Sequence, residues 1–182
     1  MKQALLIIDI QCDYFPGGAM ELVGTEAAAD NAAKLIAQFR EHSHPIVHLQ
    51  HIALDSDATF FKPDTKGAEI HESVKPLACE IVVQKNYPNG FRETDLLQHL
   101  RDLNVDSLLI VGMMTQLCVD TTTRAAADLG FDCTLAHDAC ATLDLEFAGN
   151  KVSAADVQTA YLAGISGAFA KVIATGKLMV EN

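Results

Sequence analysis

Short apolar runs alternate with longer amphipathic segments along this chain. Four segments carry apolar residues at helical spacing with Ser or Thr at or near the start, which predicts helices over 25–41, 94–103, 118–129 and 153–165. The short runs are continuously apolar, which is typical of strands buried on both faces. They cover 4–8, 46–50, 81–84, 108–111, 133–136 and 170–172. This alternation predicts an α/β fold of three layers, αβα, around a mainly parallel six-stranded sheet.

The length of 182 residues, of which 49% are hydrophobic, predicts a single domain over 1–182. A net charge of -11 argues against nucleic acid or an anionic membrane as partner, because both bind clustered Lys and Arg. A small-molecule substrate is the remaining expectation. No apolar run approaches the roughly 20 residues of a membrane span, and Met1-Lys2 leads directly into a predicted strand. We therefore expect a cytoplasmic protein.

The cysteines give no disulfide or zinc pattern. Their number is odd and no CxxC spacing occurs, so we expect reduced thiols. The five are Cys12, Cys79, Cys118, Cys133 and Cys140.

Cys118 stands where a buried strand is predicted to turn into a helix. A thiol at a helix N-terminus faces unpaired N–H groups and the positive end of the helix dipole, and both favour the thiolate. This position makes Cys118 a candidate nucleophile. The alternative is an inert buried cysteine that only fills space.

Two other predicted strand ends offer partners for such a thiol. The first apolar run ends in Asp9, and the third is followed by Gln84 and Lys85. Carboxyl ends of parallel strands meet at one edge of the sheet, so an acid, a cation and a thiol are expected there together. Lys85 would then lower the pKa of the Cys118 thiol, and Asp9 would accept its proton. Taken singly, each residue also suits a structural role.

These residues carry a family resemblance over nearly the whole chain. The sequence resembles the isochorismatase-like cysteine hydrolases, a group that includes nicotinamidases and N-carbamoyl amidohydrolases. The resemblance implies a catalytic triad of Asp9, Lys85 and Cys118, a cis peptide between Met113 and Met114, an oxyanion hole made by the N–H groups of Met114 and Cys118, and a homo-oligomer, either dimer or tetramer. The matching pieces are Leu5 to Gln11, Asp13-Tyr14-Phe15, Gly17-Gly18, Lys85, Asn89-Gly90-Phe91, Thr94-Asp95-Leu96, Gly112, Thr115, Cys118-Val119, Thr123-Arg124-Ala125 and Asp138-Ala139.

Departures from the family pattern narrow the chemistry. The nicotinamidase branch holds a divalent metal with an Asp-x-His pair after the second strand and a later histidine. Here Gln50 and His51 are followed by Ile52 and Ala53, and residues 60–64 contain no histidine. We therefore predict no metal and no other cofactor. The isochorismatases proper resemble this chain in fold but typically lack the cysteine, so Cys118 favours covalent acyl chemistry.

Two long connections complete the picture. Residues 52–79 are predicted to pass over the site, where Tyr14, Gln50, Tyr87 and Phe91 are candidate substrate contacts, although aromatic residues also pack loops onto cores. Residues 143–152 carry alternating apolar side chains that either meet a second subunit or fold back onto their own core. No role is assigned to the histidines His48, His51, His71 and His137.

The sequence therefore predicts a cysteine-dependent hydrolase that cleaves a C–N bond, amide or carbamoyl, through a thioester. The alternatives are hydrolysis of an ether or ester on the same scaffold, and a non-catalytic redox or binding protein with a reactive thiol. Asp9 and Lys85 argue against the second, because thiol oxidation needs no carboxylate base.

Overall fold

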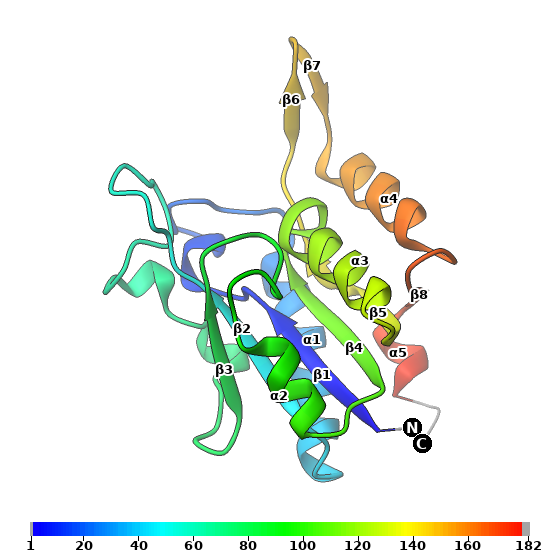
Figure 1. Ribbon diagram of the computed structural model, residues 1–182. Helices are drawn as coiled ribbons and strands as arrows, with labels where there is room; N and C mark the ends of the chain where they lie inside the picture. The colour runs from blue at the N-terminus through cyan, green and yellow to red at the C-terminus, as the bar shows by residue number, and fades with distance from the viewer. Residues whose placement is uncertain (1, 180–182) are drawn as a thin grey trace.

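The computed structural model describes residues 2–179 and is built on a six-stranded sheet in the order β3-β2-β1-β4-β5-β8 (Figure 1). All five neighbouring pairs are parallel. The predicted three-layer α/β fold with a parallel sheet is confirmed. The strands are β1 Gln3–Ile8, β2 Ile46–His51, β3 Ile81–Lys85, β4 Ser107–Met113, β5 Asp132–Ala141 and β8 Lys171–Ile173.

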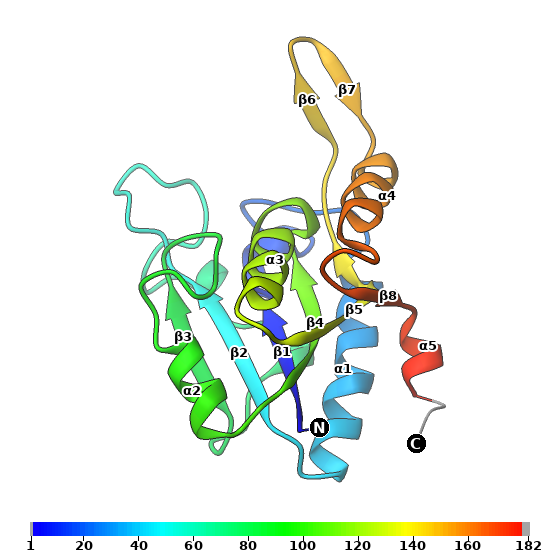
Figure 2. The ribbon, with the colours of Figure 1, turned by 45° about the vertical axis from the view of Figure 1, so that its right-hand side comes forward.

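Side chains of β1 point alternately to two hydrophobic layers, as the period of two in a strand requires. Leu5 and Ile7 pack with residues of α1 (Thr25–Glu41) on one face, while Leu6 and Ile8 face the other layer. Figure 2 shows α2 and α3 in front of the sheet and α1 behind it. The remaining helices are α2 Leu96–Asp102, α3 Asp120–Asp128, α4 Ala154–Ile165 and α5 Thr175–Leu178. Both faces of the sheet are therefore covered.

The connection over residues 52–79 contains two short 3-10 turns, Lys66–Ala68 and Glu72–Val74, and is anchored by the buried Asp13. Asp13 Oδ2 accepts a hydrogen bond from Phe61 N at 2.6 Å, and Oδ1 accepts one from Ala19 N at 3.2 Å. A Cβ on Gly67 would lie 2.1 Å from Asp13 Oδ1, so only glycine allows this close approach. The carboxylate thus joins two irregular segments at the edge of the sheet.

Residues 143–152, predicted as a loop, include an antiparallel hairpin of β6 (Leu145–Phe147) and β7 (Asn150–Val152). The hairpin projects from the body next to α4 (Figures 1 and 2). Of the alternating apolar side chains, Leu143 packs against the core of its own chain, whereas Phe147 is 85% exposed. The alternative in which these side chains fold back onto their own core therefore holds for Leu143 and is wrong for Phe147. Among the described residues, no helix is long and apolar enough to cross a membrane.

Candidate active site

The carboxyl ends of β1, β3 and β4 bring Asp9, Lys85 and Cys118 together. β1 lies between β2 and β4, the point where the strand order reverses and where ligands bind in open α/β sheets. Lys85 Nζ lies 2.7 Å from Asp9 Oδ2 and 3.3 Å from Cys118 Sγ. The three residues are 0%, 1% and 4% exposed, respectively. The edge of the sheet thus holds a closed cluster of an acid, a cation and a thiol.

The Lys85 ammonium lies among four acceptors. Lys85 Nζ donates to His51 Nδ1 at 2.9 Å, to the Tyr87 carbonyl at 3.1 Å and to Cys118 Sγ at 3.3 Å. Its charge partner, Asp9 Oδ2, is nearer still at 2.7 Å. Three protons are therefore shared among four acceptors. A carboxylate has about four lone-pair sites, so Asp9 can accept a proton in addition to its contact with Lys85.

Asp9 is held in an unusual backbone conformation. Its φ is 49°, in the left-handed region that non-glycine residues seldom adopt, and the cost of about 1–3 kcal/mol concentrates at functional sites. Hydrogen bonds from Asp9 N to Leu49 O and from Gln11 N to Asp9 O fix this turn. The end of β1 is thereby bent so that its carboxylate meets Lys85.

Cys118 lies in a π-turn over Thr115–Val119 that leads directly into α3. The predicted helix start at residue 118 is wrong, since the helical segment begins three residues earlier. Ahead of it, the Met113–Met114 peptide is cis. Gly112 has φ +138°, and a Cβ there would lie 2.1 Å from Ile8 O. The close approach of β4 to β1 therefore requires glycine at residue 112, shortly before the turn that carries Cys118.

The electrostatics of the cluster correct the expectation of a resting thiolate. Burial raises the pKa of the Cys118 thiol, the charge of Asp9 raises it further, and Lys85 only partly opposes these effects. Burial favours neutral Lys85, but the charges of Asp9 and Cys118 raise the pKa of its ammonium overall. These directions favour a neutral thiol and a charged ammonium group in the resting cluster.

His51, to which sequence reasoning assigned no role, belongs to this cluster. It ends β2, pairs with Lys85 in the strand register, and lies 3.9 Å from Asp9 Oδ2 through Nδ1. Burial, followed by the charge of Lys85, lowers the pKa of its imidazole to about 4. The sequence contains a signal for this position, because His51 follows the second apolar run as Asp9 follows the first.

A metal could use Asp9, His51 and Cys118, whose ligand atoms lie within 4.8 Å of one another. The Lys85 ammonium contacts all three of these residues at 2.7, 2.9 and 3.3 Å. A divalent ion would have to displace this buried cation, so the donor set does not fit a metal while Lys85 is charged.

The four candidate substrate contacts have different surroundings. Tyr14 is buried beside Phe61, with ring centroids 4.6 Å apart, and the pKa of its hydroxyl is raised first by burial and then by Cys118 and Asp9. Tyr87 reaches the cluster through its carbonyl, while its ring lies under Arg92 at 3.6 Å.

The other two are held by structural contacts. The amide of Gln50 donates to Ala68 O at 2.9 Å and accepts from Gln84 at 3.1 Å. Phe91 stacks on Phe131 at 6.3 Å and packs against the hydrophobic layer under α2 and α3. Both side chains thus have structural contacts, and their contact with a substrate stays a prediction.

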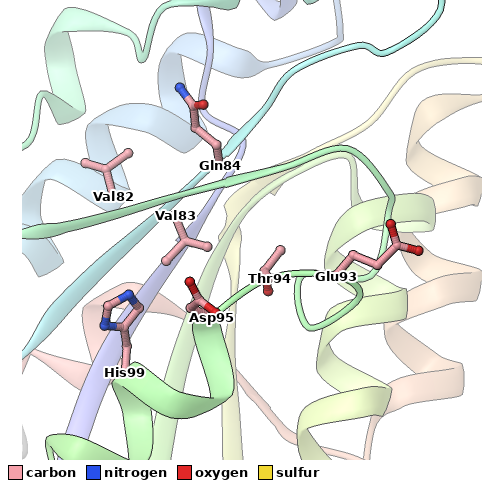
Figure 3. A pocket seen from close by; sticks show the side chains of 7 residues that line it. All are labelled: Val82, Val83, Gln84, Glu93, Thr94, Asp95 and His99. Atoms are coloured by element: carbon pink, nitrogen blue, oxygen red, sulfur yellow. The ribbon is translucent and has the colours of Figure 1, made fainter.

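A separate surface pocket of about 480 Å³ lies beside β3 and the start of α2 (Figure 3). Its carboxylates and imidazole belong to Glu93, Asp95 and His99, with no nucleophile among its lining residues. It contains none of the predicted site residues. We therefore place the candidate active site at the closed cluster instead.

Comparison with known proteins gives the relatives of this chain. A model of the isochorismatase domain matches residues 3–175. YddQ of Bacillus subtilis, an uncharacterised isochorismatase family protein, is 46% identical over 96% of this chain and 97% of its own length. Maleamate amidohydrolase of Pseudomonas putida is 31% identical over 71% of this chain and 68% of that enzyme. A crystal structure of an Oleispira antarctica protein of the isochorismatase hydrolase type gives a TM-score of 0.95 at 50% identity, covering 98% and 96% of the two chains.

Proposed function

Because this chain belongs to the isochorismatase family of hydrolases, we propose that it is a cysteine-dependent hydrolase that cleaves a C–N bond in a small amide or carbamoyl compound. The observation that carries the proposal is the position of Lys85 Nζ, 2.7 Å from Asp9 Oδ2 and 3.3 Å from Cys118 Sγ. The relative named maleamate amidohydrolase supports the choice of a C–N bond.

The first half of the reaction forms a thioester. Asp9 takes the proton of the Cys118 thiol, and the sulfur then bonds to the carbonyl carbon of the substrate. The carbonyl oxygen becomes an oxyanion, which the N–H groups of Met114 and Cys118 stabilise; one such donor is typically worth about 3 kcal/mol. The C–N bond breaks as Asp9 returns the proton to nitrogen, so ammonia or an amine leaves.

The second half releases the acid. Asp9 takes a proton from water, and the resulting hydroxide oxygen bonds to the thioester carbon. The C–S bond then breaks, and the proton on Asp9 returns to the Cys118 sulfur. Lys85 remains an ammonium throughout and stabilises first the carboxylate and then the thiolate, as its hydrogen bond to the sulfur allows.

The burial and protonation of Cys118 argue for this scheme over a redox or binding role. Thiols that sense oxidants are exposed and carry a lowered pKa, whereas Cys118 is 4% exposed and its pKa is raised. A protonated thiol next to a carboxylate with free lone pairs suits general base catalysis. Cleavage of an ester or ether uses the same groups and is distinguished by experiment.

The test is hydrolysis of a substrate panel of primary amides, N-carbamoyl amino acids, esters and a vinyl ether, with ammonia detected directly. We expect the wild type to release ammonia from at least one amide or carbamoyl compound, and Cys118→Ala and Cys118→Ser to release almost none. Cys79→Ser is the matched control, because Cys79 is an exposed free cysteine. Full activity of Cys118→Ala would contradict the covalent mechanism, and turnover of the esters or the ether alone would contradict the C–N assignment.

A further inference from the structure

Four acceptors surround the ammonium of Lys85. The Nζ to Asp9 Oδ2 distance is 2.7 Å, shorter than the distances to His51 Nδ1, the Tyr87 carbonyl and Cys118 Sγ. An ammonium has three protons, so it cannot give each of these four acceptors a full hydrogen bond. His51, Tyr87 and Cys118 therefore compete with Asp9 for the protons of Lys85.

The backbone N–H and carbonyl groups of His51 are both hydrogen-bonded to one buried side-chain amide, that of Gln11. His51 N donates to Gln11 Oε1 at 2.7 Å, and Gln11 Nε2 donates to the His51 carbonyl at 2.9 Å. Gln11 is 0% exposed, and the same Nε2 also donates to Ala68 O at 2.8 Å. A buried amide with these bonds satisfied holds the end of β2 rigidly against the extension of β1.

We infer that His51 is a positioning residue whose Nδ1 takes one proton of the Lys85 ammonium, which weakens the hydrogen bond from that ammonium to Asp9 and keeps the carboxylate basic enough to accept the thiol proton of Cys118. The inference rests on the proposed function and adds a residue to it. Nδ1 accepts, so the neutral imidazole carries its proton on Nε2. Without an acceptor at this place, the ammonium gives a stronger hydrogen bond to Asp9 Oδ2, and a carboxylate that accepts a stronger charged hydrogen bond is a weaker base.

Two substitutions of His51 test whether its hydrogen-bond acceptor matters or only the space that its ring fills. His51→Asn places an amide oxygen near the position of Nδ1, whereas His51→Leu fills similar space with no acceptor. We expect His51→Leu to lower kcat about 10- to 100-fold with little change in KM, a part of the 10²–10⁴-fold that a general base typically contributes. His51→Asn should recover most of that loss. His99→Asn, in the separate pocket of Figure 3, is the matched control and should leave kcat unchanged.

A spectroscopic measurement tests the same arrangement without turnover. Long-range ¹H–¹⁵N correlation spectra of the full chain labelled with ¹⁵N-histidine, assigned by loss of the signal in His51→Asn, report which ring nitrogen of His51 carries the proton. We expect the neutral form protonated on Nε2 at pH 7. A proton on Nδ1 would overturn the inference. Equal kcat in His51→Leu and wild type, or no recovery in His51→Asn, would also overturn it, while the Cys118→Ala result tests the proposed function separately.

Discussion

Replacing Asp9 by Asn should make Cys118 more reactive toward alkylating agents while abolishing hydrolysis. Asp9 raises the pKa of the thiol, so loss of its charge favours the thiolate. The same loss removes the base that the proposed mechanism requires. Asn is the suitable replacement, because it tolerates the left-handed φ of 49° that most other residues would not.

The size of the effect follows from the geometry. The ligand atoms of Asp9 and Cys118 lie within 4.8 Å of each other. At an effective dielectric constant of about 20, two unit charges at that separation interact by about 3.5 kcal/mol, which is roughly a 300-fold change in the thiol–thiolate equilibrium. A thiolate of lower pKa is a weaker nucleophile, with a Brønsted slope of about 0.5, so the net gain in alkylation rate is about 20-fold.

The assay is the rate of Cys118 carboxamidomethylation by iodoacetamide at pH 7, followed by peptide mass spectrometry because Cys79 is also accessible. Asp95→Asn removes an exposed carboxylate and is the control for overall charge. We expect faster alkylation in Asp9→Asn only, together with ammonia release reduced at least about 100-fold. Slower alkylation in Asp9→Asn would refute the electrostatic reasoning, since it would mean that Asp9 promotes the thiolate at rest.

Three further outcomes are expected. Incubation with EDTA should leave activity unchanged, because the Lys85 ammonium contacts all three members of the only group of possible metal ligands found among the described residues, Asp9, His51 and Cys118. Activity that is lost on EDTA treatment and regained with zinc or manganese would contradict this prediction. The pKa of His51 in the folded protein, about 4, lies below the usual 6.5, so its contribution to stability is complete above pH 6.5 and is lost as pH falls toward 4, by up to about 3 kcal/mol. Denaturation midpoints of His51→Asn should therefore fall less between pH 6.5 and pH 4 than those of the wild type. Equal pH dependence of the two midpoints would contradict this prediction. The exposed Phe147 predicts that the β6–β7 hairpin contacts a second copy of this chain. Light scattering should therefore give an assembly larger than the 19.6 kDa monomer, and Phe147→Asp should weaken that assembly. A monomeric wild type would refute this prediction.

The periodic segments of this fold were predictable because each expresses one physical rule. The helix over Thr25–Glu41 has the bounds that its apolar spacing predicts, and the strand cores follow from their continuous apolar runs. The hairpin was not predictable in the same way. Leu145 and Phe147 alternate as strand residues do, but two short strands without a core beneath them look like a loop in sequence.

The candidate site shows a similar division. Residue types at strand ends identified Asp9, Lys85 and Cys118, since parallel strands bring their carboxyl ends to one edge. The pKa of the Cys118 thiol depends on its burial and on whether the charge of Asp9 or that of Lys85 has the larger effect, and neither can be predicted from a sequence. The contact of His51 with Lys85 depends on which ring atom of His51 faces the ammonium, and only coordinates give that orientation.

The burial of Cys118 affects which cysteine of this protein peroxide oxidises first. Peroxide attacks thiolates that it can reach, and Cys118 is a protonated thiol with 4% exposure, whereas Cys79 is exposed. Sulfenic acid should thus form first at Cys79, in the loop before β3. A buried, protonated thiol is the form least open to oxidation, so Cys118 should survive exposure to peroxide longer than Cys79.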